Sequence, residues 1–242
     1  MKIGTLYGIS AGPGDPELLT VKALRLLQRS PVVAYPAGIG GKPGFAEQIV
    51  SKWRQPHQIQ LALTFPYVQE QDTLESAWRV AAEEVWQHLQ QGQDVVFASE
   101  GDVSFYSTFT YLAQTLQQQQ PEARVEAIPG VCSPLAAIAA LGLPLTLRGD
   151  RLVVVPALYQ TEELAAILKW ADVVVLMKVS SVYAQAWHIL KQQDLLERSY
   201  VVEWATLPQQ VIHSNLADCP DLNLPYFSLL IVHVTALSSR PF

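Results

Sequence analysis

The sequence predicts an α/β protein built from two lobes. Short apolar runs rich in β-branched residues alternate with segments of helical period over almost all of the 242 residues. Strands and helices that alternate and are joined by short loops indicate a layered α/β architecture. Half of the residues are hydrophobic, which is enough for a sizeable core in one large domain or two small ones. We therefore expect two α/β lobes with an interdomain cleft, a usual place for a ligand.

The first predicted strand begins at Ile3 and leads into a glycine-rich turn, residues 8–20 (GISAGPGDPELLT). Asp15 is a favourable N-cap and Pro16 suits the first helical position, so we expect one helix to begin there. The face of this helix that we expect to be buried consists of Leu18, Val21, Leu24 and Leu27. Glycine has no side chain, so a turn of this kind lets a ligand approach the backbone closely.

This turn matches neither of two common phosphate-binding loops. A Walker loop has Lys followed by Ser or Thr after its last glycine, where this chain has Asp15 and Pro16. A dinucleotide fingerprint reads G-x-G-x-x-G, whereas the glycines here are Gly8, Gly12 and Gly14. We therefore do not expect a nucleotide-phosphate enzyme. Taken alone, the turn fits a plain strand-to-helix connection as well as it fits a ligand site.

The rest of the chain continues the alternation. In the first lobe we expect strands at residues 32–35, 94–98 and 125–128, helices at 73–91, 105–116 and 134–141, and a flexible loop at 38–44. In the second lobe we expect strands at 152–155, 172–177, 199–203, 210–214 and 226–234, and helices at 162–169 and 181–192. The pattern resets within residues 143–150, which predicts an N-terminal domain of residues 1–148 and a C-terminal domain of residues 149–242.

Charge and composition restrict the classes of function. The net charge of −6 and the pI of about 5.3 disfavour a general nucleic-acid binder but allow a local basic pocket. No apolar run approaches the roughly 18 residues of a membrane span, and Met1 leads straight into the first strand without a signal peptide. Cys132 and Cys219 suit a reducing compartment, and the five His residues form no metal-binding pair. We expect a cytoplasmic protein that itself holds no metal.

Two more glycine turns follow predicted strands of the first lobe. Glu100-Gly101-Asp102 comes directly after one strand, and residues 128–133 (IPGVCS) repeat the arrangement. Such strand ends are where α/β proteins place their sites, although propensity alone favours Asp102 as a helix N-cap. Three glycine turns at strand ends of one lobe begin to outline a pocket.

Together these motifs resemble the tetrapyrrole methylases, the class III S-adenosylmethionine methyltransferases of corrin and sirohaem synthesis. The motifs occur in order over essentially the whole chain, at residues 12–20, 100–102, 128–131, 142–145, 176–178 and 205–208. Others resemble the branch that methylates C20 of precorrin-2 or of its cobalt form, cobalt-factor II, at residues 33–36, 64–66, 105–107, 177–179 and 225–229. The chain departs from the family's pattern at Val103, where Pro is usual, and at Cys132, where Thr or Ser is usual.

The resemblance implies that S-adenosylmethionine lies in the interdomain cleft and leaves as S-adenosylhomocysteine. Carried over motif by motif, the cofactor-binding residues are Pro13, Glu100, Gly101, Asp102, Phe105, Cys132, Ser133, Met177 and Ala205. The methylated ring carbon must lose a proton, so a base within reach would help. Asp102 is the first candidate for this base, and Tyr106 is a weaker polar helper.

The implied substrate is an uroporphyrin-type ring with eight carboxylates, which an acidic protein must hold through local positive charge. Candidates on predicted loops or strand ends are Lys42, Arg148, Arg151 and Lys178, each of which also fits an ordinary surface cation. The family further implies a homodimer, and any cobalt would arrive with the substrate. Two alternatives stay open, namely a methylase of another ring carbon and a non-catalytic tetrapyrrole-binding protein. The intact turns at Gly12 and Glu100 argue against the second.

Overall fold

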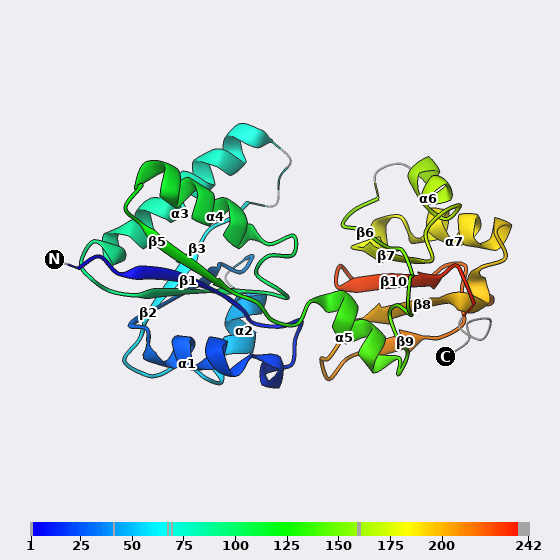
Figure 1. Cartoon of the computed structure of the whole chain (residues 1–242), viewed down its shortest axis with the longest axis horizontal. Coiled ribbons are helices and arrows are strands. Elements are labelled where there is room, and N and C mark those ends of the chain that lie inside the picture. The colour runs from blue at the N-terminus through cyan, green and yellow to red at the C-terminus, as the bar shows by residue number, and fades with distance from the viewer. Residues whose placement is uncertain (1, 41, 67, 69, 159–160, 237–242) are drawn as a thin grey trace. The chain divides into compact units, whose positions relative to one another are not determined.

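The computed structural model describes residues 2–40, 42–66, 68, 70–158 and 161–236 and contains two compact units (Figure 1). Unit 1 is Met1–Cys132 and unit 2 is Ser133–Phe242. This division precedes the predicted one between residues 148 and 149. The reason is helix α5 (Ser133–Ala140), whose Ala137 and Ile138 pack into the hydrophobic core of unit 2. Each unit is an α/β structure, as the sequence predicted.

Unit 1 is built on a parallel five-stranded sheet with the order β3-β2-β4-β1-β5. Strands β1 to β5 are Thr5–Ser10, Val32–Pro36, Ile59–Leu63, Val95–Ser99 and Arg124–Ile128. Helices α1 to α4 are Val21–Arg29, Phe45–Ser51, Gln71–Leu89 and Thr108–Gln119. Helices α1 and α2 pack on one face of the sheet, and α3 and α4 pack on the other (Figure 1). Strands β2 and β4 are buried, as expected for strands covered on both faces.

The sheet of unit 1 has a topological switch point between β1 and β4. Strands β1 and β4 are neighbours, but α1 follows β1 on one face and α4 follows β4 on the other. The chain therefore leaves these two adjacent strand ends in opposite directions. In open α/β sheets, ligands bind at the carboxyl ends of the strands at such a switch point. The glycine turns after β1 and β4 lie at this position.

The start of α1 differs from the prediction. The Asp15 carboxylate caps only a short 3₁₀ turn, Pro16–Leu18, and accepts a hydrogen bond from the Glu17 N–H at 2.8 Å. Thr20 is the N-cap of α1. The buried residues of α1 are Ala23, Leu26 and Leu27. The predicted buried face was therefore wrong for Val21, which is 81% exposed.

Other differences from the prediction have local causes. Helix α2 and strand β3 were not predicted. Strand β3 lies at the sheet edge, where its residues 59, 60 and 62 are exposed. Helix α4 begins at Thr108 rather than at 105, because the Ser107 hydroxyl caps it by accepting a hydrogen bond from the Phe109 N–H at 3.1 Å.

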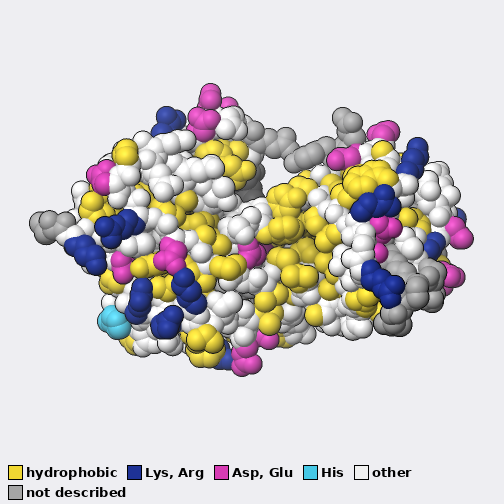
Figure 2. All heavy atoms as spheres, in the orientation of Figure 1, with side chains coloured by type: hydrophobic (Ala, Val, Ile, Leu, Met, Phe, Trp, Pro, Cys, Tyr) yellow, Lys and Arg dark blue, Asp and Glu magenta, His cyan; other side chains and the backbone are white. Residues whose placement is uncertain are grey.

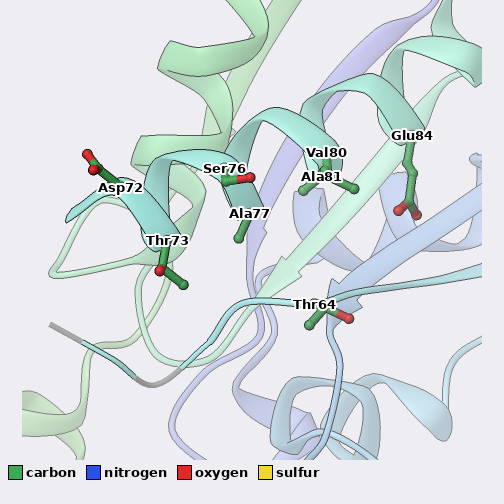
Figure 3. A pocket seen from close by; sticks show the side chains of 8 residues that line it. All are labelled: Thr64, Asp72, Thr73, Ser76, Ala77, Val80, Ala81 and Glu84. Carbon is green, nitrogen blue, oxygen red and sulfur yellow. The ribbon is translucent and has the colours of Figure 1, made fainter. Parts of the chain in front are cut away.

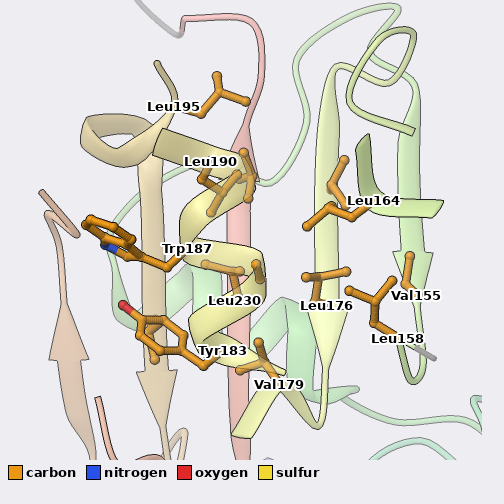
Figure 4. Close-up of a cluster of buried hydrophobic side chains, with 14 of the residues drawn as sticks. Val155, Leu158, Leu164, Leu176, Val179, Tyr183, Trp187, Leu190, Leu195 and Leu230 are labelled. Atoms are coloured by element: carbon orange, nitrogen blue, oxygen red, sulfur yellow. The ribbon is translucent and has the colours of Figure 1, made fainter. Parts of the chain in front are cut away.

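Unit 2 contains a mixed five-stranded sheet with the order β6-β7-β10-β8-β9. Strands β6 to β10 are Leu152–Val155, Val173–Met177, Ser199–Glu203, Val211–His213 and Ser228–His233. Helix α5 covers one face of this sheet. Helices α6 (Thr161–Ile167) and α7 (Tyr183–Gln192) cover the other, where Trp187 is the largest side chain of the core and donates to the Leu216 carbonyl at 2.6 Å (Figure 4). In the described ranges, no helix combines the length and the apolar composition needed to cross a membrane.

Candidate functional site

Two glycines join the loops that follow β1 and β4. The Gly12 N–H donates to the Gly101 carbonyl at 3.1 Å, and the Gly101 N–H donates to the Gly12 carbonyl at 2.9 Å. The φ angles of these residues are +81° and +67°, in a region that glycine adopts without steric cost. The paired glycines therefore fix both loops to each other at the switch point of the sheet.

The Asp102 carboxylate holds a third loop, the one after β5, in the same place. Its Oδ2 accepts hydrogen bonds from the Gly130 N–H at 2.7 Å and from the Ser10 hydroxyl at 3.2 Å. Its Oδ1 accepts from the N–H and the hydroxyl of Ser104, at 2.9 and 2.6 Å. Only 8% of Asp102 is exposed. This single carboxylate therefore links the ends of three neighbouring strands, β4, β1 and β5.

Ser10, the last residue of β1, completes this arrangement. Its hydroxyl accepts a hydrogen bond from the Val103 N–H at 2.8 Å. The hydroxyl has one proton, which it donates either to Asp102 Oδ2 or to the Ile128 carbonyl oxygen, 2.9 Å away. A Cβ added to Gly130 would lie 2.5 Å from the Cβ of Ser10, so only glycine allows the β5 loop to approach this closely.

These contacts determine the acidity of Asp102. Burial by itself would raise the pKa of this carboxyl. The hydrogen bonds from the Ser104 hydroxyl, from the N–H groups of Gly130 and Ser104, and from the Ser10 hydroxyl outweigh burial and hold the pKa below its ordinary value. A carboxylate with a low pKa and with both oxygens engaged is a poor proton acceptor. The geometry therefore argues against Asp102 as the base and favours a positioning role.

The other predicted cofactor residues of unit 1 lie in the same loops. Pro13 is buried next to Gly12, Glu100 is exposed at the end of β4, and Cys132 is half-buried after Gly130. Phe105 is half-buried, and its ring meets the ring of Tyr106 edge-on with 4.7 Å between the centroids. Tyr106 is 56% exposed. The structure thus gathers the unit 1 candidates around the joined loops.

In unit 2, Met177 and Ala205 lie at the same end of the sheet, at the carboxyl ends of β7 and β8. Met177 ends β7, and Ala205 follows β8 after one intervening residue. Strands β7 and β8 both run antiparallel to β10, which lies between them, so their carboxyl ends point the same way. Ser133 is the first residue of α5 and lies in the same unit. Lys178 follows Met177 directly and is exposed.

The structure does not bring all four predicted substrate cations together. Arg151 precedes β6, and its guanidinium binds the Asp172 carboxylate with an Nε–Oδ2 distance of 2.9 Å. These hydrogen bonds hold the pKa of Asp172 well below its usual range. The pair lies at the amino ends of β6 and β7, whereas Lys178 lies at the carboxyl end of β7, so these two cations are at opposite ends of the strands. Lys42 and Arg148 are exposed on loops.

Backbone strain adds residues that the sequence did not reveal. Within the described ranges, six non-glycine residues have a positive φ. Four of them follow the ends of β4, β7 and β8: Tyr106, Lys178, Trp204 and Thr206. Left-handed conformations of such residues are costly and concentrate at functional sites. Trp204 and Thr206 were not predicted as site residues, because no residue-type preference in the sequence signals this conformation for them.

A cavity of about 510 Å³ in unit 1 lies elsewhere, between α3 and the chain after β3 (Figure 3). Its lining combines small and hydroxyl side chains with two acidic residues, Asp72 and Glu84. None of the predicted site residues lines it. Two carboxylates would repel a polycarboxylate ligand, so this cavity does not fit the predicted substrate.

The distribution of charge also limits how an anionic ligand is held. On the face shown in Figure 2, Lys and Arg side chains are interspersed with Asp and Glu side chains. With a net charge of −6, the protein as a whole does not attract a polycarboxylate. Individual cations near the site must therefore provide the attraction.

The chain is similar in sequence to a known family and to two methyltransferases. The family model described as Tetrapyrrole (Corrin/Porphyrin) Methylases matches residues 5–220. A precorrin-2 C(20)-methyltransferase of Sinorhizobium sp is 34% identical over 238 residues, which cover 95% of this chain and 95% of the relative. A cobalt-precorrin-2 C(20)-methyltransferase of Salmonella typhimurium is 32% identical over 231 residues, which cover 95% of this chain and 96% of the relative.

A solved structure supports the fold. The uroporphyrin-III C-methyltransferase of Thermus thermophilus, complexed with S-adenosylhomocysteine, is 26% identical and has a TM-score of 0.67. The match covers 95% of this chain and 97% of that chain. The two-lobe α/β architecture expected from the sequence is thus the architecture of solved methyltransferases.

We predict that Asp102→Asn destabilises the protein by about 1–3 kcal/mol, because the amide nitrogen of Asn would face donors that now bind a carboxylate oxygen. Urea unfolding at neutral pH measures this loss. Asp94→Asn is the matched control, because Asp94 accepts one hydrogen bond, from the Thr5 N–H at 2.8 Å, which the Asn oxygen can still accept. Equal losses in the two variants would contradict the role of Asp102.

The same variant gives a pH test. Since the pKa of Asp102 is lowered in the folded state, its contribution is present above the ordinary Asp pKa of about 3.9 and is lost as the pH falls through the folded-state value. The stability difference between the wild type and Asp102→Asn should therefore narrow only in this acid range. A difference that narrows near neutral pH would point to another group.

Proposed function

Because the chain belongs to the tetrapyrrole (corrin/porphyrin) methylases, we propose that it methylates C20 of precorrin-2 or of its cobalt form, cobalt-factor II. The methyl donor is S-adenosylmethionine, and the products are precorrin-3A or cobalt-factor III in cobalamin biosynthesis. The observation that carries this proposal is the similarity over 95% of the chain to relatives named as C20-methyltransferases of precorrin-2 and cobalt-precorrin-2.

The joined loops of unit 1 fit the cofactor. A Cβ added to Gly101 would meet no described atom within 4 Å, so the backbone at the switch point is open to a ligand. We assign the cofactor to the backbone of Pro13, Glu100, Gly101 and Asp102. The further cofactor residues we propose are Phe105, Cys132, Ser133, Met177 and Ala205. When bound, S-adenosylmethionine supplies a methyl group on a positively charged sulfur that a nucleophilic carbon displaces in line.

The residues of this chain contribute mainly position. Asp102 holds the three loops together before any ligand arrives, so little ordering is left for the bound state. Alignment of reacting groups supplies roughly 7–11 kcal/mol in favourable cases. Tyr106, exposed and held at a φ of +53° in the loop that follows β4, remains the proposed polar helper for proton removal. The thiol of Cys132 is a weaker hydrogen-bonding group than the hydroxyl usual at this position.

The substrate carboxylates need cations that are not already engaged. Lys178, Lys42 and Arg148 remain proposed for this role. Arg151 is the weakest candidate, since Asp172 already holds its guanidinium. We also propose that the protein works in the cytoplasm as a homodimer, as the family resemblance implies, and that any cobalt enters with the tetrapyrrole.

We predict that the purified protein, given S-adenosylmethionine labelled in its methyl group, adds one methyl group to precorrin-2 or to cobalt-factor II at C20. Mass spectrometry and NMR of the labelled product measure the number and the position of the methyl groups. Methylation at another carbon would overturn the substrate assignment. Binding of tetrapyrrole without binding of S-adenosylhomocysteine would favour a non-catalytic binding protein.

We predict that Gly101→Ala weakens S-adenosylhomocysteine binding by about tenfold or more, or at least about 1.4 kcal/mol, because its Cβ enters the proposed site. Titration calorimetry measures the Kd. Gly142→Ala is the matched control, because Gly142 also has a φ of +67° and open space around an added Cβ. Both variants should lose about 1–2 kcal/mol of stability to the strained conformation. Equal Kd values for the two variants would contradict the assignment of Gly101.

A further inference from the structure

Four side chains form a connected row along one end of the unit 2 sheet, where β7 and β8 finish and where Met177 and Ala205 lie. We call this row the aromatic edge; its members are Lys178, Trp204, Tyr226 and Phe227. The rings of Trp204 and Phe227 lie 4.9 Å apart, and those of Tyr226 and Phe227 lie 5.2 Å apart. The Lys178 ammonium lies over the Tyr226 ring, 5.6 Å from its centroid.

The sheet pairing explains why these residues meet. Lys178 is the first residue after β7, and Trp204 is the first residue after β8. Strand β10 lies between β7 and β8 and begins at Ser228, directly after Tyr226 and Phe227. The Trp204 N–H donates to the Phe227 carbonyl at 2.8 Å, which extends the ladder by one step. The aromatic edge thus crosses the ends of three adjacent strands.

Two members of the aromatic edge are held in a costly backbone conformation. The φ angles of Lys178 and Trp204 are +52° and +50°, although neither residue favours the left-handed region. Turning the chain in this way right after each strand fixes the direction in which both side chains leave the sheet. Residues in this conformation concentrate at functional sites, which is consistent with a ligand-binding role for these two positions.

The aromatic edge is chemically suited to a flat ligand with negative groups at its rim. Tyr226 is 49% exposed, so part of its ring is accessible to a ligand. Among the described residues, Lys178 forms no ion pair, so its charge is available to an anion. The carboxylate of Glu203, the residue before Trp204, is held by His213 at 2.8 Å and does not compete for that charge.

We propose that the aromatic edge binds the tetrapyrrole, with Lys178 holding one carboxylate of the ring substituents and Tyr226 contacting the adjoining apolar surface. This inference rests on the proposed function and extends it to the residues that select the substrate. The aromatic edge suits the tetrapyrrole better than the cofactor. The tetrapyrrole carries many carboxylates, whereas the cofactor carries a single carboxylate together with a sulfonium and an ammonium group, so its net charge is positive and a lysine favours the tetrapyrrole.

The test compares the KM for the tetrapyrrole with the Kd for S-adenosylhomocysteine. We expect Lys178→Met and Tyr226→Ala to raise the KM by about three- to tenfold, the range of an exposed ion pair or a modest apolar contact. The kcat and the S-adenosylhomocysteine Kd should stay unchanged. Tyr226→Phe and Lys178→Arg should restore a KM close to that of the wild type. The KM effect of Lys178→Met should also shrink at high salt, which screens the lost attraction.

Lys191→Met is the matched control, because the Lys191 ammonium likewise lies over an aromatic ring, that of Trp187 at 5.0 Å, but on helix α7. A KM for Lys178→Met equal to that of this control would overturn the inference. A weaker S-adenosylhomocysteine Kd with an unchanged KM would assign the aromatic edge to the cofactor and also overturn it. If the wild type transfers no methyl group to the tetrapyrrole, the proposed function itself fails, which separates the two results.

Discussion

The geometry of the candidate site depends on the hydrogen bonds that the Asp102 carboxylate accepts. Three strand ends, those of β4, β1 and β5, meet at this group through Ser104, Ser10 and Gly130. Loops are ordinarily the most mobile parts of an α/β protein. A buried carboxylate that accepts bonds at all three strand ends joins them to one another. Gly101, paired with Gly12, leaves open space beside them, because an added Cβ there would meet no described atom within 4 Å.

The two units contribute different chemistry. Unit 1 offers backbone groups at the switch point of a parallel sheet, which suits a ligand recognised by close approach and hydrogen bonds. Unit 2 offers exposed aromatic rings and a lysine at the edge of a mixed sheet, which suits a flat anionic ligand. A methyl transfer needs both kinds of recognition, since a small donor and a large acceptor must be held in line.

The sequence predicted where the glycine loops lie better than what their residues contact. Glycine turns after apolar runs identify strand ends, so the loops at Gly12, Gly101 and Gly130 could be placed from local patterns. The contacts of Asp102 could not, because Gly130 and Ser10 are 28 and 92 residues away in sequence. Local propensity instead suggested a helix cap, and the family resemblance suggested a base. The separation of Arg151 from Lys178 could not be read from the sequence for a similar reason, since only the strand directions show that they lie at opposite ends of the strands.

Amide hydrogen exchange of the protein without ligands tests the central claim most directly, namely that the three loops are already joined before binding. Residue-resolved NMR would follow the N–H groups of Gly12, Gly101, Val103 and Gly130, each of which donates a hydrogen bond. The account predicts exchange as slow as that of the central strands β1 and β4, because these loops open only when the sheet opens. Exchange as fast as that of an unprotected, solvent-exposed amide would contradict it.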